Sequence, residues 1–210
     1  MLAAAERLFA EHGVAAVSNR QVSEAAGQGN HTAVGYHFGT KTGLIRAIVR
    51  LHGERIERLR DEMTAGDPAD ARGWVRCLVQ PLTAHLAELG TPTWFGRFTA
   101  QIVTDPAYHE IVMAESLTSP SLVRALDGLD GCAAGLPAEV RLERRDMARL
   151  LTVHMVAGRE RALAEGTPTP SGSWRDFTGS LVDAIVGLWC APVTRPPVTC
   201  GRSARFRQDR

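Results

Sequence analysis

Apolar positions recur every three to four residues along most of the chain, and strand-like alternation of β-branched residues is nearly absent. This periodicity predicts amphipathic helices, so the expected fold class is all-α. A first short helix is expected around Ala5, Leu8 and Phe9. The further helices are expected over residues 19–26, 31–38, 41–63, 69–89, 94–103, 106–129, 137–165 and 173–189.

Capping residues divide the segment 18–41 into two short helices and the start of a third. Ser18, with Gln21 three residues later, has the form of a capping box at the start of the first helix. Gly27 stands where a helix end commonly needs a left-handed residue. The remaining signals are Asn30 as N-cap of the second helix, Gly39 after its end, and Thr40 as N-cap of the third.

Two helices as short as these bury little apolar surface by themselves. Their small inner faces, with Val22, Ala26 and Val34, need a neighbour, and the helix that carries Leu8 and Phe9 supplies one. The segment therefore predicts a three-helix head with a helix-turn-helix inside it. The usual role of such a motif is to place its second helix in the major groove of DNA.

Three segments in succession, ERLFAEHG, VSNRQVSEAAG and TAVGYHFGTKTGL, resemble the N-terminal domain of the tetracycline-repressor (TetR) family of bacterial transcription regulators. The resemblance spans Leu2 to about Val49, and the YHF motif followed by Lys41 is its most specific part. It implies a DNA-binding domain over residues 1–46, an effector-binding and dimerisation domain over 47–191, and a homodimer. The turn at residues 28–30 is one residue longer than the commonest form in this family.

Charge is unevenly distributed although the net charge of the chain is only +1. Residues 1–60 carry eight basic and five acidic side chains, whereas residues 61–191 carry eleven and seventeen. A basic head on an acidic body suits a protein that contacts phosphate at one end. Residues 192–210 are rich in Pro and Arg and are expected to form a disordered basic tail.

The front of the second short helix supplies the DNA-binding candidates. Phe38 is expected in the core. For Asn30 and His31, a solvated side chain without a DNA contact is as good an explanation as a DNA contact. The candidates near base edges are Asn30, His31, Thr32 and Gly35, and those near phosphates are Tyr36, His37 and Lys41.

The body is expected to hold a small apolar or amphipathic effector, because aromatic and methionine side chains with a few polar groups make up such sites. Ordinary core packing is the stronger explanation of these residues taken one by one, and for His154 a core or interface position explains it as well as a ligand contact does. The ligand-binding candidates are Trp74, Trp94, Phe95, Phe98, Gln101, Met113 and His154.

The last helix is apolar on more than one face and therefore needs cover from outside its own chain. A four-helix bundle formed by the last two long helices of two copies is the simplest cover. The expected dimer-interface residues are Leu151, Met155, Gly158, Leu181, Ile185 and Leu188.

No catalytic motif is present, so an enzyme is not expected, nor is a cofactor. The four cysteines are widely spaced and suggest incidental thiols of a reducing cytoplasm rather than disulfides or a metal site. The longest apolar run contains Asp183 and is too short for a bilayer. We expect a cytoplasmic transcription regulator, a repressor that an effector releases from a palindromic operator. An activator, or a DNA-binding regulator without a ligand, is the alternative.

Overall fold

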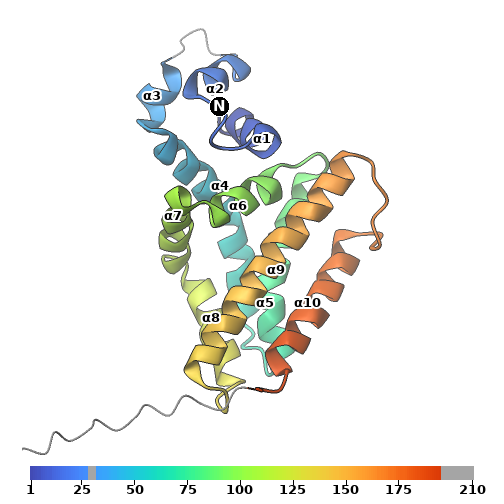
Figure 1. The fold of residues 1–210 in the computed structure, drawn as a ribbon. Coiled ribbons are helices and arrows are strands. Elements are labelled where there is room, and N and C mark those ends of the chain that lie inside the picture. The colour runs from blue at the N-terminus through green and yellow to red at the C-terminus, as the bar shows by residue number, and fades with distance from the viewer. Residues whose placement is uncertain (28–31, 195–210) are drawn as a thin grey trace, which may run out of the picture.

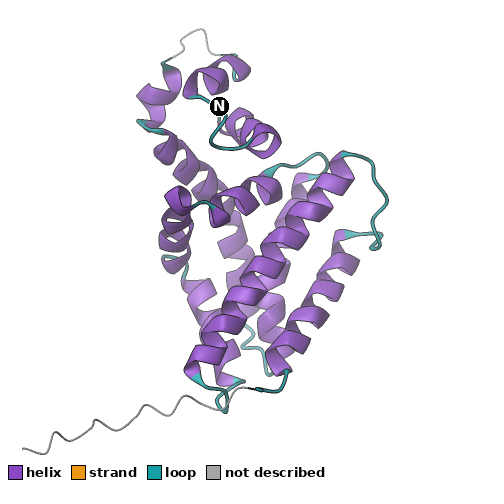
Figure 2. Cartoon of the chain, in the orientation of Figure 1, coloured by secondary structure: helices purple, strands orange, loops and turns teal. Residues whose placement is uncertain are grey.

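The computed structural model describes residues 1–27 and 32–194, and over these residues the chain forms ten helices and no strand (Figure 1 and Figure 2). The expected all-α class is confirmed. The candidates Asn30 and His31, and residues 195–210 of the expected tail, lie outside the described residues. No helix in the described part of the chain combines the length and apolar character needed to cross a membrane.

The head contains three short helices and the beginning of a long one. Its elements are α1 (Leu2–His12), α2 (Asn19–Ala25), α3 (Ala33–Phe38) and the first turns of α4 (Lys41–Thr64).

The caps within the head follow the sequence signals. The Ser18 hydroxyl accepts from the Gln21 amide at 3.3 Å while the Gln21 side chain accepts from the Ser18 amide at 2.8 Å, so the capping box is confirmed. Gly27 has a φ of 67°, which favours glycine. The Thr40 hydroxyl accepts from the Gly43 amide at 3.0 Å and begins α4.

The second short helix begins later than the sequence predicts. It starts at Ala33 and not at His31, and Thr32 is its N-cap residue. Within the described residues, the first helical hydrogen bond runs from the Tyr36 amide to the Thr32 carbonyl at 3.0 Å. Ala33 and Val34 are buried, so they fix this helix against the rest of the head.

The body contains six further helices. They are α5 (Ala71–Leu89), α6 (Phe95–Thr104), α7 (Pro106–Leu117), α8 (Pro120–Gly131), α9 (Ala138–Ala164) and α10 (Trp174–Cys190).

The single helix predicted over residues 106–129 is two helices, α7 and α8. The break falls at Ser119, whose backbone is extended with φ −92° and ψ 101°. Pro120 causes it, since a residue before proline is disfavoured in the helical conformation. Ser119 then caps α8 by accepting from the Leu122 amide at 3.3 Å.

Helix α4 connects the head to the body. It packs against α1 and α3 in the head and against α5, α7 and α8 in the body. The expected domain boundary between residues 46 and 47 therefore lies inside one continuous helix. In Figure 1 the head stands at one end of α4, and the long helices α5, α9 and α10 lie toward the other. The apolar core is continuous between the two parts, because Phe9 of α1 stacks on Phe98 of α6 with ring centroids 6.0 Å apart.

Candidate nucleic-acid interface and its links to the body

Helix α3 presents one buried and one exposed face. Val34 has no exposed surface and packs in the head core, whereas Gly35, Tyr36 and His37 are exposed. Tyr36 is 85% exposed, and its ring lies edge-on to that of His37 with centroids 5.2 Å apart. An aromatic ring exposed to this extent contributes nothing to core packing. It is available for a contact with another molecule.

Lys41 has a structural contact that the sequence does not reveal. Its ammonium group donates to the Val14 carbonyl at 2.9 Å and so ties the start of α4 to the loop after α1. An ammonium group has three donors, so this bond leaves others for a phosphate.

The DNA-binding candidates that the structure describes lie close together along the chain on α3 and its flanks. Thr32, Gly35, Tyr36 and His37 are exposed, and Lys41 is half-buried. Phe38 packs against the core as expected.

Gln101 of α6 holds the end of α1 from the body side. Its Nε2 donates to the Phe9 carbonyl at 2.9 Å, and its Oε1 accepts from the Val14 amide at 3.0 Å. This side chain was expected to orient a ligand. The structure places it instead between head and body.

A second link between head and body passes through a buried row of polar groups. His52 Nε2 of α4 lies 2.8 Å from Glu6 Oε2 of α1, and His52 Nδ1 lies 2.8 Å from His85 Nε2 of α5. Each of the three residues is only 6% exposed, and the Phe95 ring stacks on His52 with centroids 4.0 Å apart. If His52 donates to Glu6, then His85 donates to His52, and one row joins three helices.

Burial lowers the pKa of His85 to about 4, and the neighbouring His52 adds to this effect. His85 Nδ1 is buried and has no hydrogen-bond partner. A proton on this nitrogen is therefore strongly disfavoured, and His85 is neutral at physiological pH.

The opposite end of α6 is fixed by Glu160 of α9. This carboxylate is 2% exposed and accepts from the Thr93 hydroxyl at 2.7 Å and from the amides of Gly96 and Arg97 at 3.0 and 2.8 Å. A carboxylate at a helix N-terminus satisfies amides that have no partner within the helix. Helix α6 is thus held by α9 at its start and bonded to α1 near its end, through Gln101.

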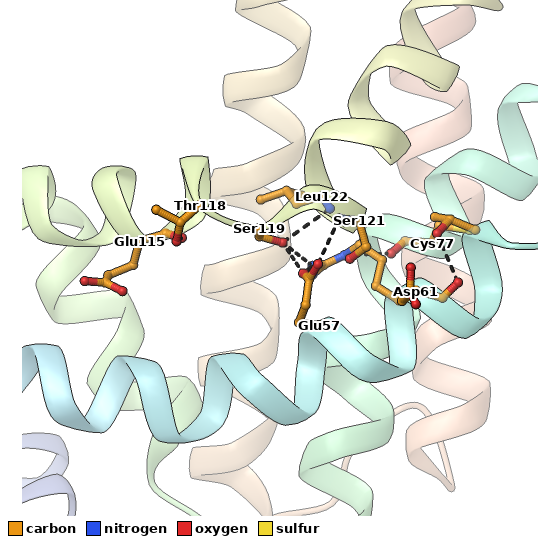
Figure 3. Close-up of polar contacts among 10 residues, drawn as sticks. Glu57, Asp61, Cys77, Glu115, Thr118, Ser119, Ser121 and Leu122 are labelled. Atoms are coloured by element: carbon orange, nitrogen blue, oxygen red, sulfur yellow. Dashed lines mark hydrogen bonds and ion pairs between the residues drawn. The ribbon is translucent and has the colours of Figure 1, made fainter.

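Glu57 of α4 performs a similar role at the start of α8 (Figure 3). Its carboxylate accepts from the Ser119 hydroxyl and from the Ser121 amide, the latter at 2.8 Å. Burial would raise the pKa of Glu57, but the hydrogen bonds from Ser119 and Ser121 outweigh it and hold the pKa below its usual value. Nearby Arg60 is buried and donates to the Cys77 carbonyl of α5 at 3.2 Å.

Helix α7 is tied to α4 closer to the head. Glu115 lies 3.4 Å from the guanidinium of Arg46 and 2.9 Å from that of Arg50. Helix α4 is therefore bonded to α1, α5, α7 and α8 and joins the head to the body.

The seven ligand-binding candidates do not converge on one cavity. Phe95 and Phe98 are core residues, Trp94 is the half-buried N-cap residue of α6, and Met113 and His154 are exposed. Trp74 alone among the seven lines the larger of two surface hollows described in the body. That hollow has a volume of about 520 Å³ and is lined by Asp67, Trp74, Pro120, Val123, Arg124, Asp127 and Gly128.

The structure corrects part of the expected dimer interface. Leu181 and Ile185 are buried in the chain's own core, where α10 packs against α5, so they have no surface to offer a second copy. Leu151 and Leu188 are partly buried. Met155 and Gly158 of α9 are exposed as an interface requires, and they continue an exposed apolar stripe that includes Met147 and Leu150.

A head with this arrangement of α2, α3 and α4 is a helix-turn-helix DNA-binding domain. Residues 1–48 match the family model of bacterial regulatory proteins of the tetR family. This match covers the head and supports a DNA-binding transcription regulator with a head of the tetR type. No curated protein sequence matches the chain.

Proposed function

We propose that the protein binds a near-palindromic operator as a homodimer, represses transcription there, and is released by a small apolar or amphipathic effector. The exposed face of α3, with Tyr36 at its centre, is the observation that carries the DNA-binding part. The links through Gln101 and His52 support the regulatory part, because they couple the head to a body that has no evident role in reading DNA.

In this proposal Thr32 and Gly35 lie near base edges, and Tyr36, His37 and Lys41 contact phosphates. A glycine at position 35 lets the backbone approach the groove, and among the described residues outside its own helix none lies within 4 Å of where its Cβ would be. Asn30 and His31 remain candidates at the front of the helix. Phosphate contacts supply affinity for any sequence, whereas base contacts select the operator.

The DNA contacts are tested by fluorescence anisotropy over a range of salt concentrations. Tyr36→Ala should weaken binding to operator and random DNA alike. Lys41→Ala should do the same and should also reduce the slope of log affinity against log salt concentration by about one. Since Lys41 also bonds to Val14, the fold of that variant is checked by its helical circular dichroism. Leu89→Ala, at an exposed site on α5, is the control. Unchanged affinity in both folded variants contradicts the site.

The homodimer is supported by the exposed stripe on α9. Met147, Leu150 and Met155 are 49%, 38% and 47% exposed, and their helical spacing places them on one side of α9, together with the exposed His154. Met155→Glu should yield monomers with an intact fold, whereas Leu89→Glu, at an equally exposed site, should leave the dimer unchanged. A wild-type monomer at micromolar concentration in light scattering contradicts the proposal.

The effector is proposed to bind in the 520 Å³ hollow between α5 and α8, whose volume is typical of ligand sites. Trp74, Pro120 and Val123 give it an apolar wall, and Arg124 and Asp127 give it a charged rim. A ligand there would push α8 against α4 through the Glu57 contact and tilt the head. The coupling free energy needed is about 1–3 kcal/mol.

A thermal-shift screen of apolar and amphipathic compounds tests this step. A true effector must weaken operator binding by the same factor by which operator weakens effector binding, because linkage is reciprocal. Val123→Trp should fill the hollow and abolish the response while the free protein keeps its operator affinity. A compound that strengthens operator binding would instead favour the activator alternative, and a screen without hits would favour a regulator without a ligand.

A further inference from the structure

Two exposed cysteines from distant parts of the chain line one small hollow. Cys132 follows the end of α8, and Cys190 is the last residue of α10. Both are exposed, and both line a hollow with a volume of about 260 Å³. In the sequence they looked like unrelated, incidental thiols, because nothing in their spacing indicates that they meet.

The surroundings of Cys132 agree with this placement. Ala71, the first residue of α5, lines the same hollow, and the adjacent Asp70 is close enough to influence the thiol. Burial, followed by the Asp70 carboxylate, raises the pKa of Cys132. The start of α5 therefore lies beside both thiols.

Arg144 of α9 lines the same hollow and fixes the end of α10. Its guanidinium donates to the Trp189 carbonyl and, at 2.6 Å, to the Ala191 carbonyl. Cys190 stands between these two carbonyls in the chain, so its backbone is held while its side chain is exposed.

We infer that Cys132 and Cys190 form a reversible oxidation site that closes to an intramolecular disulfide. Both thiols line the same hollow and so share one patch of the surface, and a disulfide needs Cα atoms about 4.4–6.8 Å apart. Cys132 lies just past the end of α8, where the chain adjusts more readily than within a helix, whereas the backbone around Cys190 is held by Arg144. The disulfide forms when the chain at Cys132 moves until the two sulfur atoms reach bonding distance.

The oxidant is a hydroperoxide. The Cys190 thiolate attacks the terminal oxygen, the O–O bond breaks, and the sulfur becomes a sulfenic acid while the peroxide leaves as an alcohol. The Cys132 thiol then displaces water from that sulfur as it loses its proton. In total two thiols and one hydroperoxide give one disulfide, one alcohol and one water. The order of attack follows from Cys132, whose raised pKa keeps it protonated and makes it the second thiol to react.

The test uses the full-length protein treated with tert-butyl hydroperoxide, followed by alkylation of free thiols, proteolysis and mass spectrometry. The expected product is a linked pair of peptides that contain Cys132 and Cys190, lighter by two hydrogen atoms and separated again by dithiothreitol. Cys132→Ser and Cys190→Ser should each abolish the link. Cys77→Ser should not, because Cys77 is buried.

The oxidised protein should also unfold at a higher temperature than the reduced protein, since a cross-link restricts the unfolded chain. This increase should disappear in Cys190→Ser and persist in Cys77→Ser. A link from either cysteine to Cys200, a link only between two protein molecules, separate over-oxidation of the two thiols, or no reaction would each overturn the inference. None of these results bears on DNA binding, so the proposed function is tested separately.

Discussion

Acidification should destabilise this protein through His85, and the size of the effect follows from its environment. The pKa of His85 is about 4 in the folded chain and 6.5 in its ordinary state. Between these values the unfolded chain binds a proton that the folded chain does not. The contribution of neutral His85 to the free energy of unfolding is therefore complete above pH 6.5 and is lost as the pH falls toward 4.

Through His85 alone, the free energy of unfolding should fall by roughly 1 kcal/mol at pH 5.5 and by roughly 2–3 kcal/mol at pH 4.5. The groups that face His85 are His52 of α4, with Glu6 behind it, and the Arg55–Glu88 pair. Glu88 raises the pKa of His85, whereas His52 and Arg55 lower it, and burial lowers it most. The row that joins head and body should therefore weaken as His85 is protonated.

Urea denaturation of wild type and His85→Gln from pH 7.5 to pH 4.5 measures this contribution. A glutamine amide can still donate to His52, but it does not titrate, so the variant should lose less stability on acidification by the amounts above. His154→Gln, at an exposed site, should follow the wild type. Parallel stability curves for wild type and His85→Gln would refute the reasoning.

Four further variants test the contacts around α1, α4 and α8. Gln101→Ala should weaken operator binding without changing the salt slope, because it frees the end of α1 and removes no phosphate contact. Glu57→Gln should lower the free energy of unfolding by about 1–2 kcal/mol at pH 7, and this difference from wild type should shrink as Glu57 is protonated in acid. Gly43→Ala should destabilise the protein, because its Cβ would collide with the Phe38 carbonyl, whereas Gly53→Ala, with open space around it, should stabilise α4 by up to about 1 kcal/mol.

Local signals in the sequence were sufficient for most of the head. The capping box at Ser18, the left-handed Gly27 and the Thr40 cap each depend on residues within one or two turns of helix, so their patterns could be interpreted directly. The break before Pro120 was also a local signal, but the apolar periodicity on both sides of it led to a single predicted helix. The start of α3 was placed too early for a related reason: Asn30 is a good capping residue, but the first helical bond is at Thr32.

The long-range contacts could not be predicted. Gln101 bonds to α1 residues about ninety positions away, and Glu160 caps a helix that begins more than sixty positions before it. Nothing in the local sequence distinguishes such polar residues from ligand contacts or solvated side chains. Leu181 and Ile185 illustrate the same limit, since an apolar helix face does not indicate whether its own chain or a second copy covers it.

Selection of bound DNA from a random library by the purified protein tests the central claim most directly. The account predicts enrichment of one near-palindromic sequence with two half-sites, and loss of that enrichment when Tyr36 and His37 are replaced by alanine. If the folded wild-type protein enriches no sequence over the starting library, the chain does not read DNA through α3 and the account is contradicted.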